Sequence, residues 1–110
     1  MQFMGSLYVG EKIASAQYKI VEKVHKGKVV PKLYLIVLSS NSDNMLDIIP
    51  QKEVQQKYYP KDGLRIVGIA EGKKEALGLV QQMILESLRE TGSADVRGFL
   101  KAKWEGQACR

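Results

Sequence analysis

Cysteine, histidine and long apolar runs are all scarce in this sequence of 110 residues. The one cysteine, Cys109, rules out an internal disulfide and a cysteine pair that could hold a metal. The one histidine, His25, lies among lysines without a second histidine, which argues against a zinc site and favours a solvated helix end. We therefore expect no metal and no cofactor.

No apolar run approaches the roughly 20 residues that cross a membrane. The first residues also lack the basic and apolar stretches of a secretory signal, so we expect a cytoplasmic protein. Hydrophobic residues make up 45% and charged residues 26% of the chain. This balance predicts one globular domain over residues 1–110, with frayed ends at 1–5 and 104–110.

Sequence motifs for common enzyme chemistry are missing. The segment from Gly68 to Lys74 resembles a P-loop only superficially, because three residues separate its glycines and no hydroxyl residue follows the lysines. The chain contains neither a dinucleotide fingerprint nor a nucleophile elbow. The sequence therefore favours a protein without catalytic activity.

The strongest pattern in the chain is the stretch from Leu64 to Thr91. Residues 64–70 form a short apolar run typical of a buried strand, and Gly72 permits a tight turn after it. A long amphipathic helix follows, ending at Thr91 and Gly92. Its apolar residues recur at helical spacing, and we expect Val80 and Ile84 to lie at the centre of its buried face. They are Ala76, Leu77, Val80, Met83, Ile84 and Leu88.

A second helical pattern occupies the N-terminal quarter. Ser6 is a suitable N-cap, and Gly27 a suitable end for a helix over about 7–26. Its apolar face would contain Val9, Ile13, Ala16, Ile20 and Val24. Glu22 and Lys26 form an i,i+4 ion pair on its outer side.

The centre of the chain predicts a strand at 33–38, covered on both faces. Residues 45–49 fit either a second strand of a hairpin or a bend, and we favour the strand. A short helix is expected from Pro50 to about Tyr58. A final helix follows Ser93, with its inward face given by Val96, Phe99 and Leu100.

Together these elements predict a small two-layer α/β or α+β domain. N-terminal and C-terminal helices would cover a sheet of two or three strands, in the order helix, strand, possible strand, short helix, strand, long helix, final helix. About 25 residues link the strands at 33–38 and 64–70, long enough for a right-handed crossover. We therefore expect these two strands to be parallel.

The first candidate surface is the edge where both strands would end. There the polar segment 39–44 would meet 71–74, and the first amides of the long helix could attract an anion. The expected anion-binding residues are Ser39, Ser40, Asn41, Gly72, Lys73 and Lys74. In the alternative interpretation, Gly72 only makes the turn and the lysines are solvated.

The second candidate surface is basic. The net charge is +5, and residues 1–32 account for most of it, with six lysines against two glutamates. The cluster could contact nucleic-acid phosphates without sequence preference, through Lys19, Lys23, Lys26, Lys28 and Lys32. It lacks the arginines and interleaved aromatics of base recognition, so we favour a solvated helix end.

The third candidate surface is one of self-association. A small sheet has open edges that must be covered or paired. Leu79 and Leu85 lie at the margin of the long helix's stripe, and tyrosines appear in surplus at positions 8, 18, 58 and 59. We therefore expect a non-catalytic binding or interaction protein that acts as a homodimer. Binding of a small anion is the alternative function, and nucleic-acid binding is the third.

Overall fold

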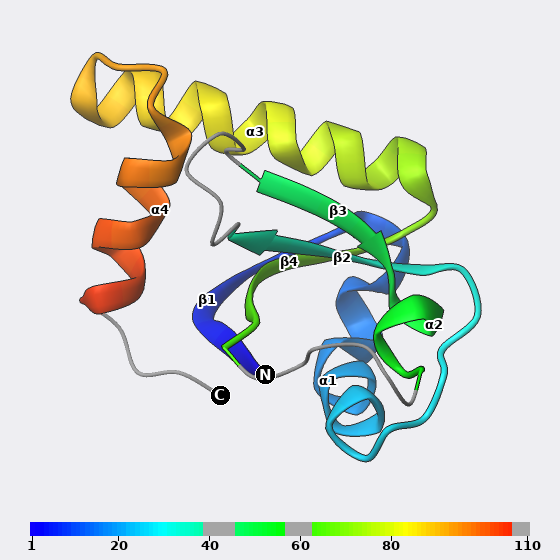
Figure 1. Ribbon diagram of the computed structural model, residues 1–110. Coiled ribbons are helices and arrows are strands. Elements are labelled where there is room, and N and C mark those ends of the chain that lie inside the picture. The colour runs from blue at the N-terminus through cyan, green and yellow to red at the C-terminus, as the bar shows by residue number, and fades with distance from the viewer. Residues whose placement is uncertain (39–45, 57–62, 107–110) are drawn as a thin grey trace.

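A mixed β-sheet with helices on both faces forms the domain (Figure 1). The structure is a computed structural model that describes residues 1–38, 46–56 and 63–106. Its elements are β1 (Gln2–Val9), the 3₁₀ helix η1 (Glu11–Ala16), α1 (Gln17–His25), β2 (Leu33–Leu38), β3 (Leu46–Pro50), α2 (Gln51–Val54), β4 (Arg65–Glu71), α3 (Lys73–Thr91) and α4 (Val96–Glu105).

The sheet has the strand order β1-β4-β2-β3. β1 and β4 are parallel, whereas β2 pairs antiparallel with both β3 and β4. The α/β class and the partly parallel sheet are therefore confirmed, and so is the strand predicted near 45–49. The sheet has four strands rather than two or three.

β1 is the strand that the sequence did not predict. The expected helix over 7–26 is wrong in its first half, because residues 2–9 form β1 and only 17–25 form α1. The helical spacing misled because Val9 on β1, Ile13 on η1 and Val24 on α1 all pack into one core. Phe3 and Met4 are completely buried, so the expected fraying of residues 1–5 is also wrong.

The expected parallel pairing of β2 with β4 is wrong. Leu33 pairs with Glu71 and Leu38 with Arg65, which is an antiparallel register. The chain first turns back through the β2–β3 hairpin, so the crossover through α2 joins β3 to β4 instead. β3 and β4 consequently run in the same direction on either side of β2.

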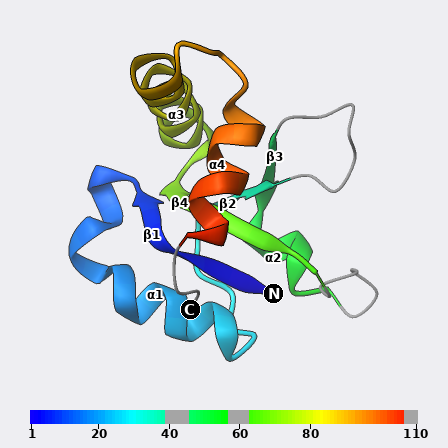
Figure 2. The same cartoon turned by 90° about the vertical axis from the view of Figure 1, so that its left-hand side faces the viewer.

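Helices cover both faces of the sheet, which gives three layers instead of the expected two (Figures 1 and 2). α3 and α4 pack on one face, where Met4, Val67 and Met83 belong to the core. α1 and α2 pack on the other face, against Phe3 and Ile66. Successive residues of β2 alternate between these two cores, as a pleated strand requires, whereas a register shift against β2 breaks the alternation of β4 at Val67 and Gly68.

The long helix α3 agrees with the prediction in extent but not in its buried face. Gly92 ends it in the left-handed conformation, with φ 73°. The residues buried on α3 are Ala76, Leu79, Met83 and Ser87. Val80 and Ile84 are only partly buried, so the predicted centre of the face is wrong. The apolar stripe is broader than the area of sheet it covers, and one margin of it stays exposed.

The C-terminal part is more ordered than expected. Val96 and Leu100 on α4 are buried as predicted, and Phe99 packs partly against the same core. Trp104 is also buried, so the expected fraying from 104 is wrong at its first residue. α2 is shorter than predicted, at four residues. Tyr58, Tyr59 and residues 107–110 lie outside the described residues.

The buried face of α3 gives a direct stability test. Met83 has no exposed surface, whereas the side chain of Leu85 is 61% exposed. We expect Met83→Ala to lower the free energy of unfolding by about 2–5 kcal/mol, because it removes core contacts and leaves a cavity. The control Leu85→Ala should change it by only about 0.5 kcal/mol. Urea denaturation measures both; equal effects would show that this face of α3 is misplaced.

Candidate anion-binding pocket

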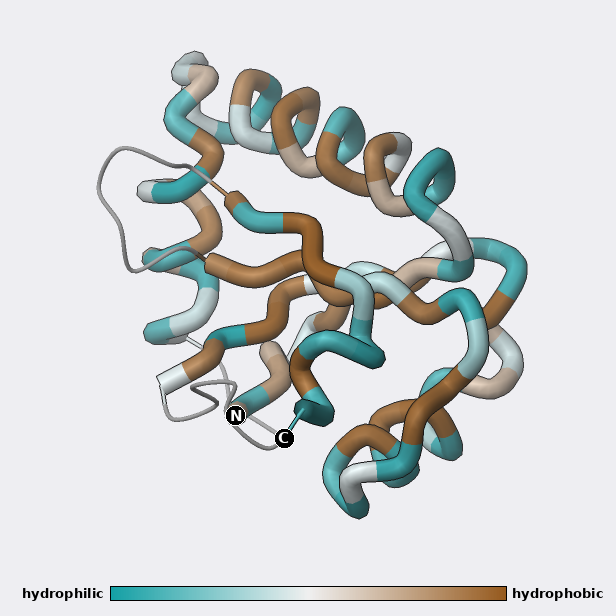
Figure 3. Tube along the Cα trace, turned by 45° about the vertical axis from the view of Figure 1, so that its right-hand side comes forward, coloured by the Kyte–Doolittle hydropathy of each residue, from teal (hydrophilic) through white to brown (hydrophobic). Residues whose placement is uncertain are grey.

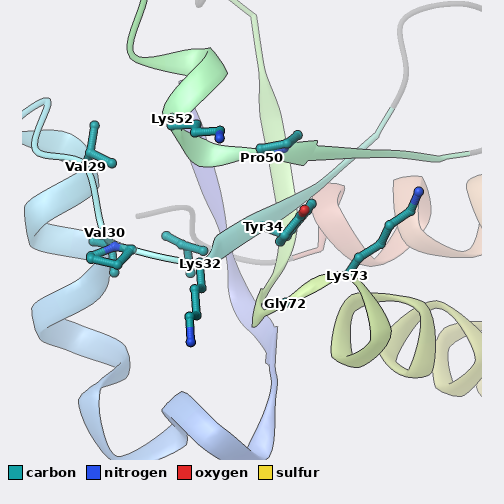
Figure 4. Close-up of a pocket in the computed structure, with 10 residues that line it drawn as sticks. Val29, Val30, Lys32, Tyr34, Pro50, Lys52, Gly72 and Lys73 are labelled. Atoms are coloured by element: carbon teal, nitrogen blue, oxygen red, sulfur yellow. The ribbon is translucent and has the colours of Figure 1, made fainter.

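A pocket of about 400 Å³ lies at one end of the sheet, between the starts of β2 and α3 (Figure 4). Three lysines give it its charge, and we call it the three-lysine pocket. Its lining consists of Val29, Val30, Pro31, Lys32, Leu33, Tyr34, Pro50, Lys52, Gly72 and Lys73.

The antiparallel sheet brings these residues together. Tyr34 near the start of β2 pairs with Pro50 at the end of β3, and Leu33 pairs with Glu71 at the end of β4. The start of one strand and the ends of its two neighbours therefore share one end of the sheet. A hydrogen bond of 2.8 Å, donated by the Gly72 N–H to the Lys32 carbonyl, closes this end.

Gln51 holds the loop that forms one wall of the pocket. Its side chain is completely buried at the start of α2. The side-chain Oε1 accepts a hydrogen bond of 2.8 Å from the Val30 N–H, and Nε2 donates one of 2.9 Å to the Lys28 carbonyl. A buried amide that satisfies two loop backbone groups fixes the path of that loop. Nothing in the sequence distinguishes Gln51 from a surface helix residue.

The backbone on both sides of the pocket adopts left-handed conformations. Gly72 has φ 84°, which glycine tolerates easily. Lys32 has φ 64° and is the only non-glycine residue with a positive φ among those the structure describes. A lysine in this conformation is strained by about 1 kcal/mol or more, and such residues cluster at ligand sites. The bond from Gly72 helps to hold it there.

The lining of the pocket is basic and apolar. Lys32, Lys52 and Lys73 are exposed, and no carboxylate is found among the described residues that line the pocket. Figure 4 shows Lys52 and Lys73 on either side of Tyr34, while the ammonium of Lys32 points away from them. Val29, Pro31 and the tyrosine ring supply apolar wall.

The N-terminus of α3 adds positive potential. No side chain caps this helix. The carboxylate of Glu75 in the first turn instead accepts hydrogen bonds from the backbone N–H groups of Glu71, at 2.9 Å, and Lys12, at 3.3 Å. It therefore leaves the start of the helix beside Gly72 open, where the helix dipole favours an anion.

The structure places the predicted ledge residues differently. Gly72 and Lys73 line the pocket, whereas Lys74 is exposed and does not. Ser39, Ser40 and Asn41 lie outside the described residues. They follow Leu38, which pairs with Arg65 at the opposite end of β4 from Gly72. The shared ledge depended on a parallel pairing that the sheet does not have. Sequence analysis missed Tyr34 and Lys52, and it assigned Lys32 to another surface.

The basic segment of α1 forms a separate surface. Lys19, Lys23, Lys26 and Lys28 line a shallow hollow of about 280 Å³ together with Glu22. The predicted pair is present, with Lys26 Nζ 2.7 Å from Glu22 Oε1, and this hydrogen bond lowers the pKa of the Glu22 carboxyl. The fifth predicted residue, Lys32, lies in the three-lysine pocket. The ring of His25 packs edge-on against Phe3 at 4.9 Å.

A polar cluster joins β1 to α3 and α4. The Tyr8 hydroxyl donates a hydrogen bond to the Glu86 carboxylate and accepts one of 3.3 Å from Lys103 Nζ. The Lys103 ammonium also lies 5.0 Å from the centre of the Tyr8 ring. Tyr8 is therefore part of the core and not a surplus interface residue. Of the other three tyrosines in that group, only Tyr18 is described, and it is 75% exposed.

Residues 1–38, 46–56 and 63–106 contain no group of three or more histidine, cysteine or acidic side chains that could hold a metal ion. Among the same residues, no helix is both long and apolar enough to span a membrane.

Comparisons with protein-family models, with curated proteins and with solved structures give no match. The geometry of the site therefore carries the functional argument.

The Tyr8 cluster predicts a pH dependence of stability. Burial, and then the hydrogen bond to Glu86, raise the pKa of the Tyr8 hydroxyl above its ordinary value of 10.0. Above that pH the unfolded chain loses this proton while the folded protein keeps it, so stability is complete below it and falls as the pH rises further. Tyr8→Phe should show a shallower decline in urea midpoint above pH 10.0. Parallel declines in both proteins would contradict the assignment.

The two hydrogen bonds from the Gln51 side chain to the loop predict that this one residue contributes strongly to the stability of the protein. Gln51→Ala leaves the Val30 N–H and the Lys28 carbonyl without their partner. These hydrogen bonds are partly buried, and an unsatisfied buried group costs about 1–3 kcal/mol, so we expect a loss of stability in that range. The control Lys52→Ala, at the next and exposed position, should have little effect. Denaturant unfolding and hydrogen exchange at the Val30 amide measure this; unchanged exchange would exclude this role of the Gln51 side chain.

Proposed function

We propose that the protein binds a small organic anion in the three-lysine pocket. This is the anion-binding function considered from the sequence, moved from the predicted ledge to the opposite end of β2. The proposal assigns binding and no chemical step, because the described lining residues include no histidine, carboxylate, serine or cysteine.

One observation carries the proposal: Lys52, Lys73 and an uncapped helix start border an apolar hollow that Lys32 also lines, and the described lining contains no opposing carboxylate. Around the hollow on α1, Glu22 already neutralises Lys26. In the three-lysine pocket the described lining offers the lysines no carboxylate, so a bound anion would serve as their counter-ion. Hydrogen bonds to charged groups contribute about 1.5–3 kcal/mol each.

The walls of the pocket indicate what kind of chemical group the ligand carries besides its anionic group. The pocket volume of about 400 Å³ lies in the lower part of the range of roughly 300–1,000 Å³ that is usual for small-molecule sites. Valine and proline side chains and the face of Tyr34 suit an apolar or aromatic body. We therefore expect a carboxylate or phosphate attached to a single ring or a short chain, in preference to an inorganic anion.

Phenyl phosphate, benzoate and inorganic phosphate are the probes for this proposal. Titration into labelled protein, followed through backbone amide shifts, should give saturable changes at Tyr34, Gly72 and Lys73. Phenyl phosphate or benzoate should bind more tightly than inorganic phosphate, because the apolar body adds contact area. The double variant Lys52→Glu/Lys73→Glu should weaken binding about tenfold or more, as expected for the loss of charge-assisted hydrogen bonds.

The matched control is Lys19→Glu/Lys23→Glu, which changes the net charge by the same amount on α1. It should leave the affinity within about twofold, since these lysines line a different hollow and salt weakens interactions between exposed charges. Equal losses in both double variants would show non-specific attraction to a basic protein. Loss only in the α1 variant would favour the hollow on α1, and with it the nucleic-acid hypothesis.

A further inference from the structure

We propose that two copies of this chain associate through the β3 edge of the sheet and the exposed margin of α3. The sequence predicts a homodimer built at least partly on a sheet edge or the margin of the long helix. Leu79, expected at that margin, is buried, whereas Leu77 and Leu88 are exposed. The surface combines an open strand edge with an apolar helix stripe beside it. This inference is independent of the anion-binding proposal.

The helix part of the surface is a row of apolar residues on α3, which we call the α3 stripe. It consists of Leu77, Val80, Ile84 and Leu88, which lie on one side of the helix at spacings of three and four residues. Leu77 is 48% exposed and Leu88 is 43% exposed, while Val80 and Ile84 are partly covered by the core. A row of this kind is typical of a helix that packs on one more element.

The strand part of the surface is β3. It ends the sheet, with β2 on one side and no further strand among the described residues on the other. Its pairing with β2 runs without a break from Leu46 to Pro50. Outward backbone groups on such a regular edge can pair with another strand. β1, at the other end of the sheet, has an irregular register between Phe3 and Tyr8, which makes a poorer template.

The two parts lie next to each other. Leu46 and Ile48 of β3 pack against the same core as Val80 and Ile84 of α3. Figure 1 shows α3 on the face of the sheet that β3 shares, and Figure 3 shows hydrophobic residues on both elements, although the main sheet contacts of α3 are with β4 and β2. A partner that docks on this face can therefore contact the strand edge and the helix stripe at once.

A second copy fits this face by symmetry. Two antiparallel β3 strands related by a twofold axis present matching donors and acceptors to each other. The same axis places both α3 helices on one face of the joined sheet, in antiparallel orientation and with their stripes turned toward each other. The result would be a continuous sheet of twice four strands, covered by a pair of helices.

The available area reaches the lower end of the range for a dimer only when the relief of the side chains is added to a flat projection. α3 has 19 residues, which corresponds to a length of about 28 Å. One helix width plus one strand spacing gives a face of roughly 16 Å, hence about 450 Å² in flat projection. Accessible area exceeds the projection because side chains protrude, and a standard interface buries about 600–1,000 Å² per partner.

Light scattering and a matched pair of variants test the proposal. At micromolar concentrations, with reductant present, the protein should have twice the chain mass of 12.3 kDa. Leu77→Arg puts a charge on the α3 stripe and should give the mass of one chain. Gln82→Arg introduces the same residue at an exposed position on another face of α3, and the dimer should persist. Leu88→Arg is the second stripe variant if Leu77→Arg does not fold, as judged by circular dichroism.

Hydrogen exchange tests the strand edge separately. Outward amides of residues 46–49 should exchange at least tenfold more slowly in the wild-type protein than in Leu77→Arg. A wild-type protein with the mass of one chain would overturn the proposal and leave this face to a different partner. A dimer that survives both stripe substitutions would place the interface elsewhere. Equal exchange in both proteins would remove the strand from the interface.

Discussion

The structure depends on β4, which is hydrogen-bonded to a neighbour on each edge and covered on each face. β1 and β2 flank it, and its residues from Ile66 to Ala70 are all buried. A strand in this position contributes to both cores at once, because Ile66 and Ile69 face α1 while Val67 and Ala70 face α3. β4 therefore joins the two layers of helices, together with β1 and β2, which also contribute residues to both cores.

Gly68 sets the distance between β4 and its neighbours. A Cβ atom at this position would lie 3.1 Å from Ile36 Cδ1, 3.2 Å from Met83 Cε and 3.3 Å from the Tyr8 carbonyl oxygen. One of these contacts is with backbone, which cannot swing aside as a side chain can. The missing side chain therefore permits the close approach of β1 and α3 to the central strand. The same requirement explains why an otherwise apolar run contains a glycine at its centre.

Local patterns identified the elements whose contacts are close in sequence. The apolar runs at 33–38 and 64–70, the end of α3 at Gly92 and the Glu22–Lys26 pair were all predictable. β1 was not, because its pairing with β4 is distant in sequence and its bulge hides the strand alternation. Spacing alone allowed parallel or antiparallel pairing of β2 with β4. That single ambiguity is why segments 39–44 and 71–74 were expected at one edge, although Leu38 and Glu71 lie at opposite ends of the β2–β4 pairing.

The residues of the candidate site also differ in whether local sequence patterns could predict their roles. Gly72 and Lys73 were recognisable, because a glycine between an apolar run and a helix indicates a turn at a helix start. Gln51 was not, because its role lies in two hydrogen bonds to a loop more than twenty residues earlier. The positive φ of Lys32 likewise follows from its tertiary surroundings, not from the residue type.

The parallel pairing of β1 with β4 has a consequence for how the chain assembles. The β2–β3 hairpin joins segments that are close in sequence, whereas Gln2 must find Arg65. Closing so long a loop is slow, so local contacts form first. During synthesis β1 emerges early but has no partner strand until β4 has followed it out of the ribosome. We therefore expect the hairpin to form first, β4 to join it, and β1 to complete the sheet last, with Phe3 and Met4 exposed until then.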